Sequence, residues 1–473
     1  MPYDIARRRL RLRPLAAALA FSIAASSSGF AALRDARLDA LAERLIARDH
    51  AGALFAPHAP DGVPIVVGNC DDAGPGSLRE AYFNAGDGAQ IDLTGLTCST
   101  ITLTSGPLTN AGTTTSVTLA GPGKYALAID GSYANRVLVH NGSGAITIGG
   151  LTITHGSYSG PYGGGCLYSY GDVLLEGAIV TGCSVSSTGT DKANGGAIYA
   201  RGEVGLLGSE VSNSRAHAAS ANSAGGGVFA HSVSLGVATI SGNTVSGDGS
   251  HYARGGGVYV LTDASVQYST FNDNEADTGG ALFLVGATSY PMAITNSTIS
   301  GNRAIGAAGG VYAKYRPLGV YNSTITQNTA GFPFGAGMYL AYDTDLESSI
   351  VAGNTSGDGL NLADIGGVSG TNITGANNLV MQSTLPLPAD TITLDPMLGP
   401  LQRNGGYTAT HALLPGSPAI DHGNANSGAR YDQRLFGPPG TQYGYERVVG
   451  PSADIGAFET GAPDHLFVDG FDP

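Results

Sequence analysis

The segment STISGNRAIGAAGGVYA, residues 297–313, joins two short runs of β-forming residues through an asparagine, a glycine pair and a tyrosine. The same order returns along the chain. Its glycine–aromatic half reads GGCLY at 164–168, GGAIY at 195–199, GGGVF at 225–229, GGGVY at 255–259, GGALF at 279–283 and GAGMY at 335–339. Successive aromatic residues are 24 to 31 residues apart, and a period of this length indicates a solenoid.

A second column of related residues lies about 15 residues after each aromatic. It comprises Cys183, Ser214, Asn243, Asn274, Asn302, Asn328 and Asn354. Each unit holds short runs of β-formers broken by turn residues, and none holds an apolar stripe long enough for a helix pair. A propeller blade needs about 40 residues and four longer strands. The repeat therefore predicts an all-β chain folded as a single-stranded parallel β-helix.

The β-helix assigns a role to each column, since equivalent residues of successive coils lie roughly 4.8 Å apart. Asparagine tolerates the left-handed conformation of a bend, and stacked amides bond one another, so we expect an asparagine ladder. The ladder would comprise Asn243, Asn274, Asn302, Asn328 and Asn354.

The strand next to the glycine pair is expected to alternate between the two faces of its sheet. The aliphatic residue before each aromatic would then face the core, and the aromatic would face outward and stack on its neighbours. The small residue two places before the aromatic would share the aromatic's face. These small residues are Cys166, Ala197, Gly227, Gly257 and Ala281.

The chain before the repeats continues the β pattern. Residues 89–156 contain short runs such as TITLT and AITIGG, enough for about three more coils. With the seven repeats this gives about ten coils and a rod roughly 50 Å long. The segment 32–50 is predicted to form one short amphipathic helix that precedes or covers the first coil.

The N-terminus has the order of a secretory signal: five arginines between residues 7 and 13, an apolar run at 15–25 and small residues at 26–31. Cleavage is expected near Ala31. Five arginines and one aspartate would leave with this segment, so the formal net charge of −14 would become −18. Such an acidic chain repels phosphate backbones, which argues against nucleic acid as a partner. No later apolar run reaches the 18 residues of a transmembrane helix.

Composition also favours an extracellular β protein, because charged residues make up only 13% and glycine accounts for 73 of 473 residues. An even number of cysteines in an exported chain predicts disulfides, and chain order suggests Cys70–Cys98 and Cys166–Cys183. Buried free thiols at 166 and 183 are an alternative. A zinc site is another, although no paired Cys/His spacing is present.

Several stretches resemble known bacterial families. GGAI at 195–198 and FNDN at 271–274 are similar to the GGAI and FxxN signatures of polymorphic outer-membrane protein repeats, over about residues 160–355. CDDAGPGSLREAYFNAGDGAQIDL at 70–93 resembles the CSLREA-type start of secreted β-helix proteins. LLPGSPAIDHGN at 413–424, DQR at 432–434 and ADIGAFE at 453–459 are similar to the choice-of-anchor Q domain. Together they imply a right-handed, pectin-lyase-like β-helix at the outer surface of a Gram-negative bacterium.

Repeats and resemblance together predict the domain order. Asp421, Asp454 and Glu459 belong to the anchor-like cap and are expected to have structural roles in turns. The end of the chain, HLFVDGFDP at 465–473, resembles a short sorting tag. The expected segments are a signal peptide at 1–31, a helical linker or cap at 32–60, the β-helix at 61–380, a choice-of-anchor Q-like cap at 381–460 and a tail at 461–473.

Polysaccharide lyases and hydrolases share the fold that the resemblance implies, and they need a cation beside carboxylates or a pair of carboxylates. The candidate acids are Asp263, Asp273, Glu275, Asp277, Asp343, Asp345 and Glu347, and the candidate cations are Lys192, Arg254, Arg303, Lys314 and Arg316. Most of these acids fall in predicted turns, where solvated charge is the expected role. NDNEAD at 272–277 lacks the spacing of a calcium loop. No catalytic residue, metal ligand or cofactor is therefore assigned, with Ca²⁺ kept as an alternative.

The sequence thus favours a monomeric, secreted or cell-surface, non-enzymatic β-helix of structural or adhesin-like type, which presents stacked loops to extracellular glycans or host surfaces. The loops 186–194, 216–224, 246–254 and 329–334 would line one edge. The alternative is a polysaccharide lyase or glycoside hydrolase, which needs carboxylates from adjacent coils within roughly 5–10 Å. A passenger of a two-partner secretion system is a third interpretation.

Overall fold

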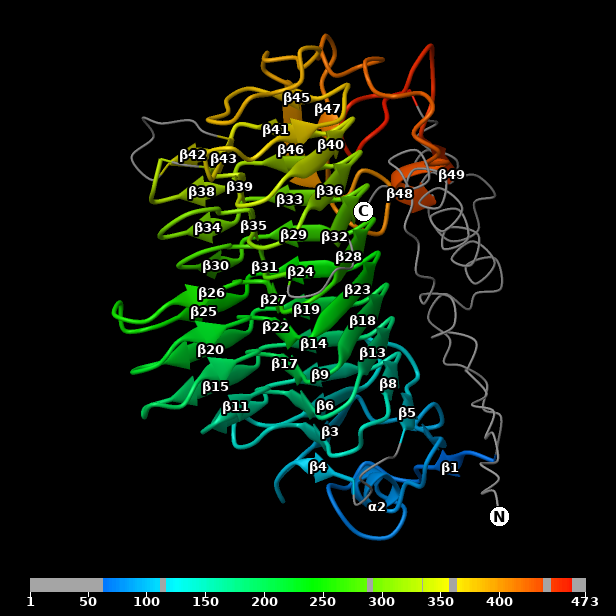
Figure 1. The fold of residues 1–473 in the computed structure, drawn as a ribbon. Helices are drawn as coiled ribbons and strands as arrows, with labels where there is room; N and C mark the ends of the chain where they lie inside the picture. Colours follow the sequence, from blue (N-terminus) through cyan, green and yellow to red (C-terminus); the bar gives the residue numbers. More distant parts are fainter. Residues whose placement is uncertain are drawn as a thin grey trace, which may run out of the picture.

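The computed structural model describes residues 63–110, 116–286, 292–333, 335–356, 364–436 and 444–461. The expected signal peptide, the expected helix at 32–50 and residues 462–473 of the expected tail lie outside these ranges. Within them the chain forms a right-handed parallel β-helix of about ten coils (Figure 1). The predicted all-β solenoid is confirmed.

Three parallel sheets form the walls of the solenoid. Sheet A has twelve strands, from β1 (Ile65–Val66) to β44 (Ile373–Thr374), and sheet B has eleven, from β3 (Thr100–Thr102) to β45 (Leu379–Val380). Sheet C has ten strands: β4 (Leu108–Thr109), β7 (Leu138–His140), β12 (Leu167–Ser169), β17 (Ile198–Ala200), β22 (Val228–Ala230), β27 (Val258–Val260), β31 (Leu282–Leu284), β35 (Val311–Ala313), β39 (Met338–Leu340) and β43 (Ile365–Gly367).

Two smaller sheets widen the coils between sheets B and C. Sheet D has eight strands from β10 (Ser157–Ser159) to β42 (Thr355–Ser356), and sheet E has four from β11 (Tyr162–Gly163) to β26 (Ala253–Arg254). The loops 186–194, 216–224 and 246–254 join D strands to E strands, so they project from one edge, as expected (Figure 1). The loop 329–334 begins in sheet D at β38 (Thr329–Ala330).

The pairing register of sheet C places repeated residues directly over one another. Tyr199, for example, pairs with Tyr168 on one side and with Phe229 on the other. The aliphatic residues before the aromatics are 0% exposed, as predicted: Leu167, Ile198, Val228, Val258, Leu282, Val311 and Met338. They belong to one continuous core along the axis, and burial of such apolar surface contributes about 25 cal/mol per Å².

The prediction for the small residue before each aliphatic was wrong. Cys166, Ala197 and Ala281 are fully buried in the same core as the aliphatic residues, not on the face of the aromatics. The alternation of a strand does not reach them, because β12 begins only at Leu167 and the chain turns just before, at Gly164 with φ +71°. Only small side chains fit this corner, next to the asparagine column.

The asparagine column forms a file inside the solenoid. The Nδ2 atom of each residue donates to the Oδ1 atom of the next at 2.8–3.0 Å, and each backbone N–H donates to the same oxygen at 3.0–3.1 Å. All members are 0% exposed: Asn243, Asn274, Asn302, Asn328 and Asn354. Buried amides that satisfy one another in this way close the corner between sheets B and D without loss of hydrogen bonds.

The left-handed residue of this bend is not the asparagine itself, contrary to the prediction. It is the residue just before: Gly242, Asp273, Gly301, Gln327 or Gly353, with φ between +57° and +70°. The left-handed residue reverses the chain, and the following asparagine then directs its side chain along the file.

The sequence pattern did not predict the residue at one end of the file, Asp364. It placed the residue at the other end, Ser214, in the same column as the asparagines. Asn354 donates from Nδ2 and from its backbone N–H to Asp364 Oδ1, at 2.9 and 2.8 Å. A carboxyl oxygen suits this end, because both groups that Asn354 directs at it are donors. Asp364 follows Asn354 by ten residues rather than by a full coil, so the repeat period gave no signal for it. At the other end, the Ser214 N–H donates to Asn243 Oδ1 at 3.1 Å.

A second polar file of serines lies at the corner between sheets A and B. Each backbone N–H donates to the hydroxyl one coil on, at 3.1–3.2 Å, from Ser269 through Ser297 and Ser323 to Ser349. The preceding residues are left-handed, among them Asn296 and Asn322. This file explains the repeated Asn-Ser-Thr triplets: the asparagine and serine form the corner, and the threonine begins the next strand.

Two disulfides close the N-terminal half. Cys70 is bonded to Cys98, and Cys166 to Cys183, with Cα–Cα distances of 6.4 and 5.4 Å. Both pairs agree with the prediction from chain order. The four cysteines are thus all bonded, which rules out the free-thiol and zinc alternatives.

The second disulfide offers a conservative test, since the next coil carries Ala197 and Ser214 at the same two columns. The variant C166A/C183S is expected to lose about 3 kcal/mol, the usual contribution of a disulfide that closes a short loop. Thermal unfolding followed by circular dichroism should show a lower midpoint than wild type. Reductant should then lower the wild-type midpoint more than that of the variant, and equal midpoints without reductant would contradict the expectation.

One short helix, α2 (Leu78–Phe83), covers the N-terminal end of the solenoid (Figure 1). Ser77 caps it by accepting the Glu80 N–H, and Glu80 Oε2 accepts the Gly76 N–H at 2.7 Å. Such reciprocal capping favours helix initiation. Leu78, Ala81 and Tyr82 are buried in the core, so the helix shields the first coil from solvent.

The segment after the last coil folds back over the outer face of sheet B. It contains β46 (Leu398–Gln402), β47 (Thr410–Leu413), β48 (Tyr431–Phe436) and β49 (Gly444–Glu446). Thr298 Oγ1 donates to Gln433 Oε1 at 2.5 Å, His411 Nε2 lies 2.8 Å from Ser300 Oγ, and the Ala457 N–H donates to Thr324 Oγ1 at 3.0 Å. The expected terminal cap therefore also lies along the side of several coils.

Candidate functional site

An unbroken file of aromatic rings runs along the outer face of sheet C, as the sequence predicted. Neighbouring ring centroids are 4.8–5.3 Å apart, with planes 3–14° from parallel. Such pairs contribute about 0.5–1.5 kcal/mol each beyond burial. We call this file the aromatic ladder: Tyr168, Tyr199, Phe229, Tyr259, Phe283, Tyr312 and Tyr339.

The ladder offers edges, not faces, to a ligand, because each ring covers the face of the next. Five of its members are tyrosines, whose hydroxyl groups lie on ring edges. Burial raises the pKa of Tyr199, Tyr259 and Tyr312 above the ordinary value. These phenols therefore stay protonated near neutral pH and can both donate and accept hydrogen bonds.

Exposed tyrosines flank the ladder. Tyr170 lies edge-on to Tyr168, with a centroid distance of 5.3 Å and an interplanar angle of 83°. Tyr162 begins β11, and Tyr252 precedes β26, the strand that leads into β27. The exposed fractions of Tyr162, Tyr170 and Tyr252 are 53%, 44% and 61%. We call the ladder and these three residues the aromatic face.

The first group of candidate acids is divided among separate contacts. Asp273 Oδ2 accepts the Asn272 side-chain amide at 2.7 Å, and Asp277 Oδ2 accepts the Ala253 N–H at 2.8 Å. Glu275 forms a surface ion pair with Arg303, at 2.5 Å between Oε1 and Nη1. Each carboxylate is held by its own partner.

Asp263 lies at a different corner, just before β28 (Ala264–Gln267) of sheet A. The second group of acids also lies at sheet A, in or beside β40 (Thr344–Glu347). Asp343 accepts the Asn372 N–H at 2.9 Å, Asp345 accepts the Tyr321 hydroxyl at 3.0 Å, and Glu347 accepts the Asn424 side-chain amide at 2.5 Å.

The coils next to Asp345 place Gly319 and Thr374 at its position. The positions paired with Asp345 on the two adjacent coils therefore carry no second carboxyl group. The other carboxyl group on this face of β40, Glu347, accepts the Asn424 side-chain amide.

The candidate cations are also dispersed. Lys192 lies in a D–E loop, Arg316 lies at the corner before β36 (Leu318–Tyr321), and Lys314 Nζ lies 4.4 Å from the Tyr315 ring centroid. Among the described residues, Arg303 is the one candidate that forms an ion pair, with Glu275. Arg254 lies over the ring of Tyr252 in the aromatic face, with 4.6 Å between its guanidinium carbon and the ring centroid.

The described part of the chain contains no group of three or more His, Cys, Asp or Glu side chains arranged for a metal ion. The acids of the stretch 272–277 illustrate the reason. Asp273 is at a left-handed bend, Glu275 faces Arg303, and Asp277 turns back to the Ala253 N–H.

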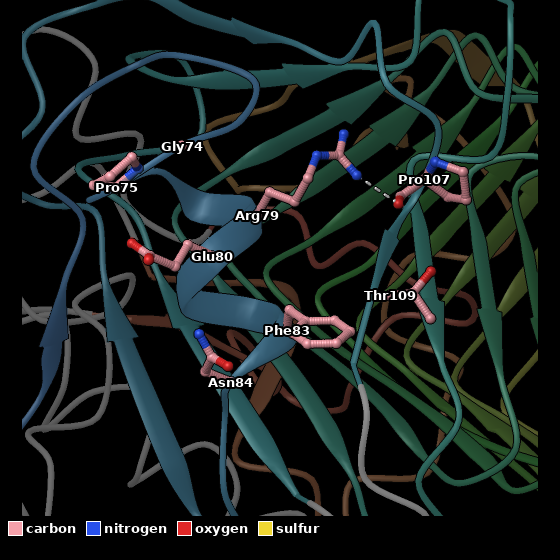
Figure 2. A pocket seen from close by; sticks show the side chains of 8 residues that line it. All are labelled: Gly74, Pro75, Arg79, Glu80, Phe83, Asn84, Pro107 and Thr109. Carbon is pink, nitrogen blue, oxygen red and sulfur yellow. Dashed lines mark hydrogen bonds between the residues drawn. The ribbon is translucent and has the colours of Figure 1, made fainter.

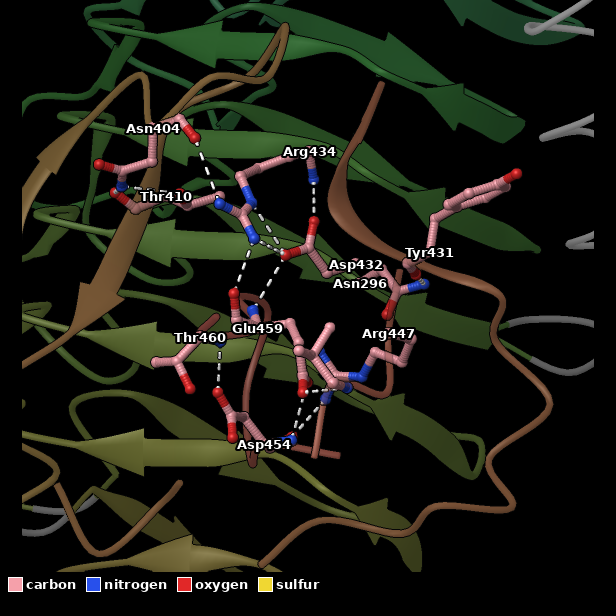
Figure 3. Close-up of polar contacts among 11 residues, drawn as sticks. Asn296, Asn404, Thr410, Tyr431, Asp432, Arg434, Arg447, Asp454, Glu459 and Thr460 are labelled. Carbon is pink, nitrogen blue, oxygen red and sulfur yellow. Dashed lines mark hydrogen bonds and ion pairs between the residues drawn. The ribbon is translucent and has the colours of Figure 1, made fainter. Parts of the chain in front are cut away.

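Two of the three acids of the anchor-like motif, Asp454 and Glu459, lie in a buried network in the C-terminal segment (Figure 3), and the third, Asp421, joins it through its backbone N–H. Asp454 Oδ1 accepts the Asp421 N–H, and Glu459 accepts the N–H groups of Val449 and Asp454, all at 2.8–2.9 Å. Burial raises the pKa of Glu459 to about 8, although the nearby Arg447 guanidinium counters this. These acids hold turns of the segment together.

Two buried arginines complete this network (Figure 3). Arg434 pairs with Asp432 at 2.6 Å and donates to the Glu459 carbonyl oxygen at 2.7 Å. Arg447 is fully buried and donates to the Asp454 carbonyl oxygen at 2.5 Å. The guanidinium groups of both arginines therefore make contacts inside the C-terminal segment.

A shallow cleft of about 440 Å³ lies between α2 and β4 (Figure 2). Arg79 crosses it and donates to the Pro107 carbonyl oxygen at 2.8 Å and to Asp72 Oδ1 at 2.5 Å. Although burial opposes the effect, hydrogen bonds from Arg79, Ser105 and Thr104 hold the pKa of Asp72 well below its usual value. The polar groups of the cleft are therefore bonded to one another, and they stabilise the N-terminal end of the solenoid.

No protein-family model, curated protein or solved structure matches the chain. No helix in the described ranges is long and apolar enough to cross a membrane. The fold and the aromatic face define the class of protein, which is a disulfide-bonded, right-handed parallel β-helix with an aromatic outer face.

Proposed function

We propose that this protein is an exported, non-enzymatic β-helix that binds glycans or cell surfaces. The aromatic face carries the proposal, because it presents ordered phenol groups and exposed rings on a rigid wall, and sugars bind through such groups. The D–E loops adjoin it, since the E strands lead directly into the C strands. The candidate acids lie apart from this surface or are held by separate partners.

We further propose export by the signal at 1–31, and display at the outer surface of a Gram-negative bacterium with a choice-of-anchor Q-like C-terminal segment. Two disulfides support an oxidising location. The GGAI/FxxN-type repeats and the CSLREA-like start support the same assignment.

The proposal predicts retention without turnover. Purified protein run through gels that contain pectin, alginate or dextran should be retarded by at least one polymer, and should release neither reducing ends nor unsaturated products. The variant Y170A/Y252A should bind roughly three- to tenfold more weakly for each ring removed. Y125A, at an exposed tyrosine outside the aromatic face, is the matched control. Release of products would establish the lyase or hydrolase alternative instead.

A further inference from the structure

Two arginines lie on the aromatic face without a carboxylate partner. The Arg201 guanidinium carbon is 4.3 Å from the Tyr170 ring centroid, and that of Arg254 is 4.6 Å from the Tyr252 centroid. Neither forms an ion pair with any described residue, although the chain carries a formal net charge of −14. No carboxylate therefore neutralises either guanidinium group through an ion pair in the part of the chain that the structure describes.

The aromatic rings hold these guanidinium groups at the surface through cation–π contacts. Arg201 also lies 5.7 Å from the Tyr162 centroid, and Arg254 lies 5.4 Å from the Phe283 centroid. Arg201 is exposed and Arg254 is partly exposed. Each contact leaves N–H groups of the planar guanidinium for a ligand, because a ring engages the face and not the edge.

The two charges are placed diagonally across the ladder. Arg201 directly follows β17, and Arg254 lies in the strand that leads into β27. One strand of sheet C, β22, separates β17 from β27, so the backbones of the two arginines are about 10 Å apart along the axis. Their guanidinium groups lie further apart, because Arg201 contacts Tyr170 next to β12 and Arg254 contacts Phe283 of β31. Phenol groups of the ladder lie between them.

We propose that the aromatic face binds an anionic polysaccharide, whose carboxylate or sulfate groups pair with Arg201 and Arg254 while its hydroxyl groups bond the ladder phenols. The inference rests on the proposed function and names its ligand class. Arginine pairs with carboxylate and sulfate-like groups through two parallel hydrogen bonds. A linear polymer with regularly spaced charges matches a wall whose side chains repeat at a fixed interval.

Binding to matched polymers tests the ligand class. Dextran and dextran sulfate share one backbone and differ in charge, and alginate supplies carboxylates. Affinity electrophoresis of the full mature chain is expected to show retardation by dextran sulfate or alginate and none by dextran. Added salt should weaken the interaction, because exposed charges are screened. The two charged polymers distinguish sulfate from carboxylate as the recognised group.

The variant R201A/R254A is expected to bind the charged polymer at least about tenfold more weakly, since two charge-assisted contacts are lost. R215A removes the same charge from an exposed position on sheet D, in β20 (Arg215–Ala218), and should bind as wild type. Circular dichroism verifies the fold of each variant.

Equal retardation by dextran and dextran sulfate would overturn this inference and leave glycan binding intact. An equal loss in R215A, or no loss in R201A/R254A, would also overturn it. Retardation by no polymer at all would overturn the proposed function as well.

Discussion

The variant N302A is expected to unfold at a markedly lower temperature than the wild type. Asn302 Oδ1 accepts the backbone and side-chain N–H groups of Asn274 at 3.0 and 2.9 Å. Its Nδ2 donates to Asn328 Oδ1 at 2.9 Å and to the Phe271 carbonyl oxygen at 3.0 Å. All these groups are buried, and each one left without a partner costs about 1–3 kcal/mol. The total loss is expected to be roughly 3–6 kcal/mol.

The matched control is N272A, on the same strand as Phe271 but with a solvent-exposed hydrogen bond to Asp273. Its stability should remain within about 0.5 kcal/mol of wild type. Denaturant midpoints followed by circular dichroism measure both changes. If N302A and N272A gave the same midpoint, the file would not contribute as described.

The carboxyl group at the end of the file is expected to make stability depend on pH. Burial raises the pKa of Asp364 from 3.8 to about 6, although hydrogen bonds from Asn354 and Gln382 oppose this. A carboxyl group with a raised folded pKa contributes fully below its unfolded pKa, and the contribution is lost as pH rises through the folded value. Ionisation of Asp364 therefore costs stability between about pH 4 and 7, on the order of 3 kcal/mol.

The variant D364N isolates this effect. Its Oδ1 can still accept the Asn354 hydrogen bonds, while its amide nitrogen faces the Gln382 N–H at a cost that does not change with pH. The free energy of unfolding of D364N relative to wild type is expected to increase from about pH 4 to pH 7. D390N, at an exposed position, controls for the change in charge. A constant difference between D364N and wild type across this range would show that Asp364 does not titrate there.

The aromatic and asparagine columns were predictable because each coil of a solenoid contacts mainly its neighbours. A residue that recurs at the period of the coil lies next to its equivalents in the adjacent coils. The neighbours of Tyr199 and Asn274 could therefore be predicted from the repeat alone. Asp364 was not predictable in this way. Asp364 follows Asn354 by ten residues instead of a full coil, and it is an aspartate where the file otherwise has asparagines.

The candidate site was less accessible from sequence. The aromatic file was recognised, but Arg201 was not singled out and Arg254 was considered only as a catalytic cation. Neither arginine recurs in the next coil, so no column pointed to it. Their association with Tyr170 and Tyr252 depends on side-chain directions at two corners.

The sequence by itself determined the coil, its period, the buried aliphatic row and the stacked aromatics, because all of these follow from contacts between adjacent repeats. Chain order suggested both disulfide pairs, with free thiols at 166 and 183 as an alternative. Only the tertiary structure decided which corner residue turns left-handed, that Cys166 and Ala197 face inward, and where the C-terminal segment lies. Gln433 bonds Ser269 and Thr298 across 164 and 135 residues. Contacts at such separations leave no repeat in the sequence. They can form only after the solenoid has folded, because the C-terminal segment packs on its outer face.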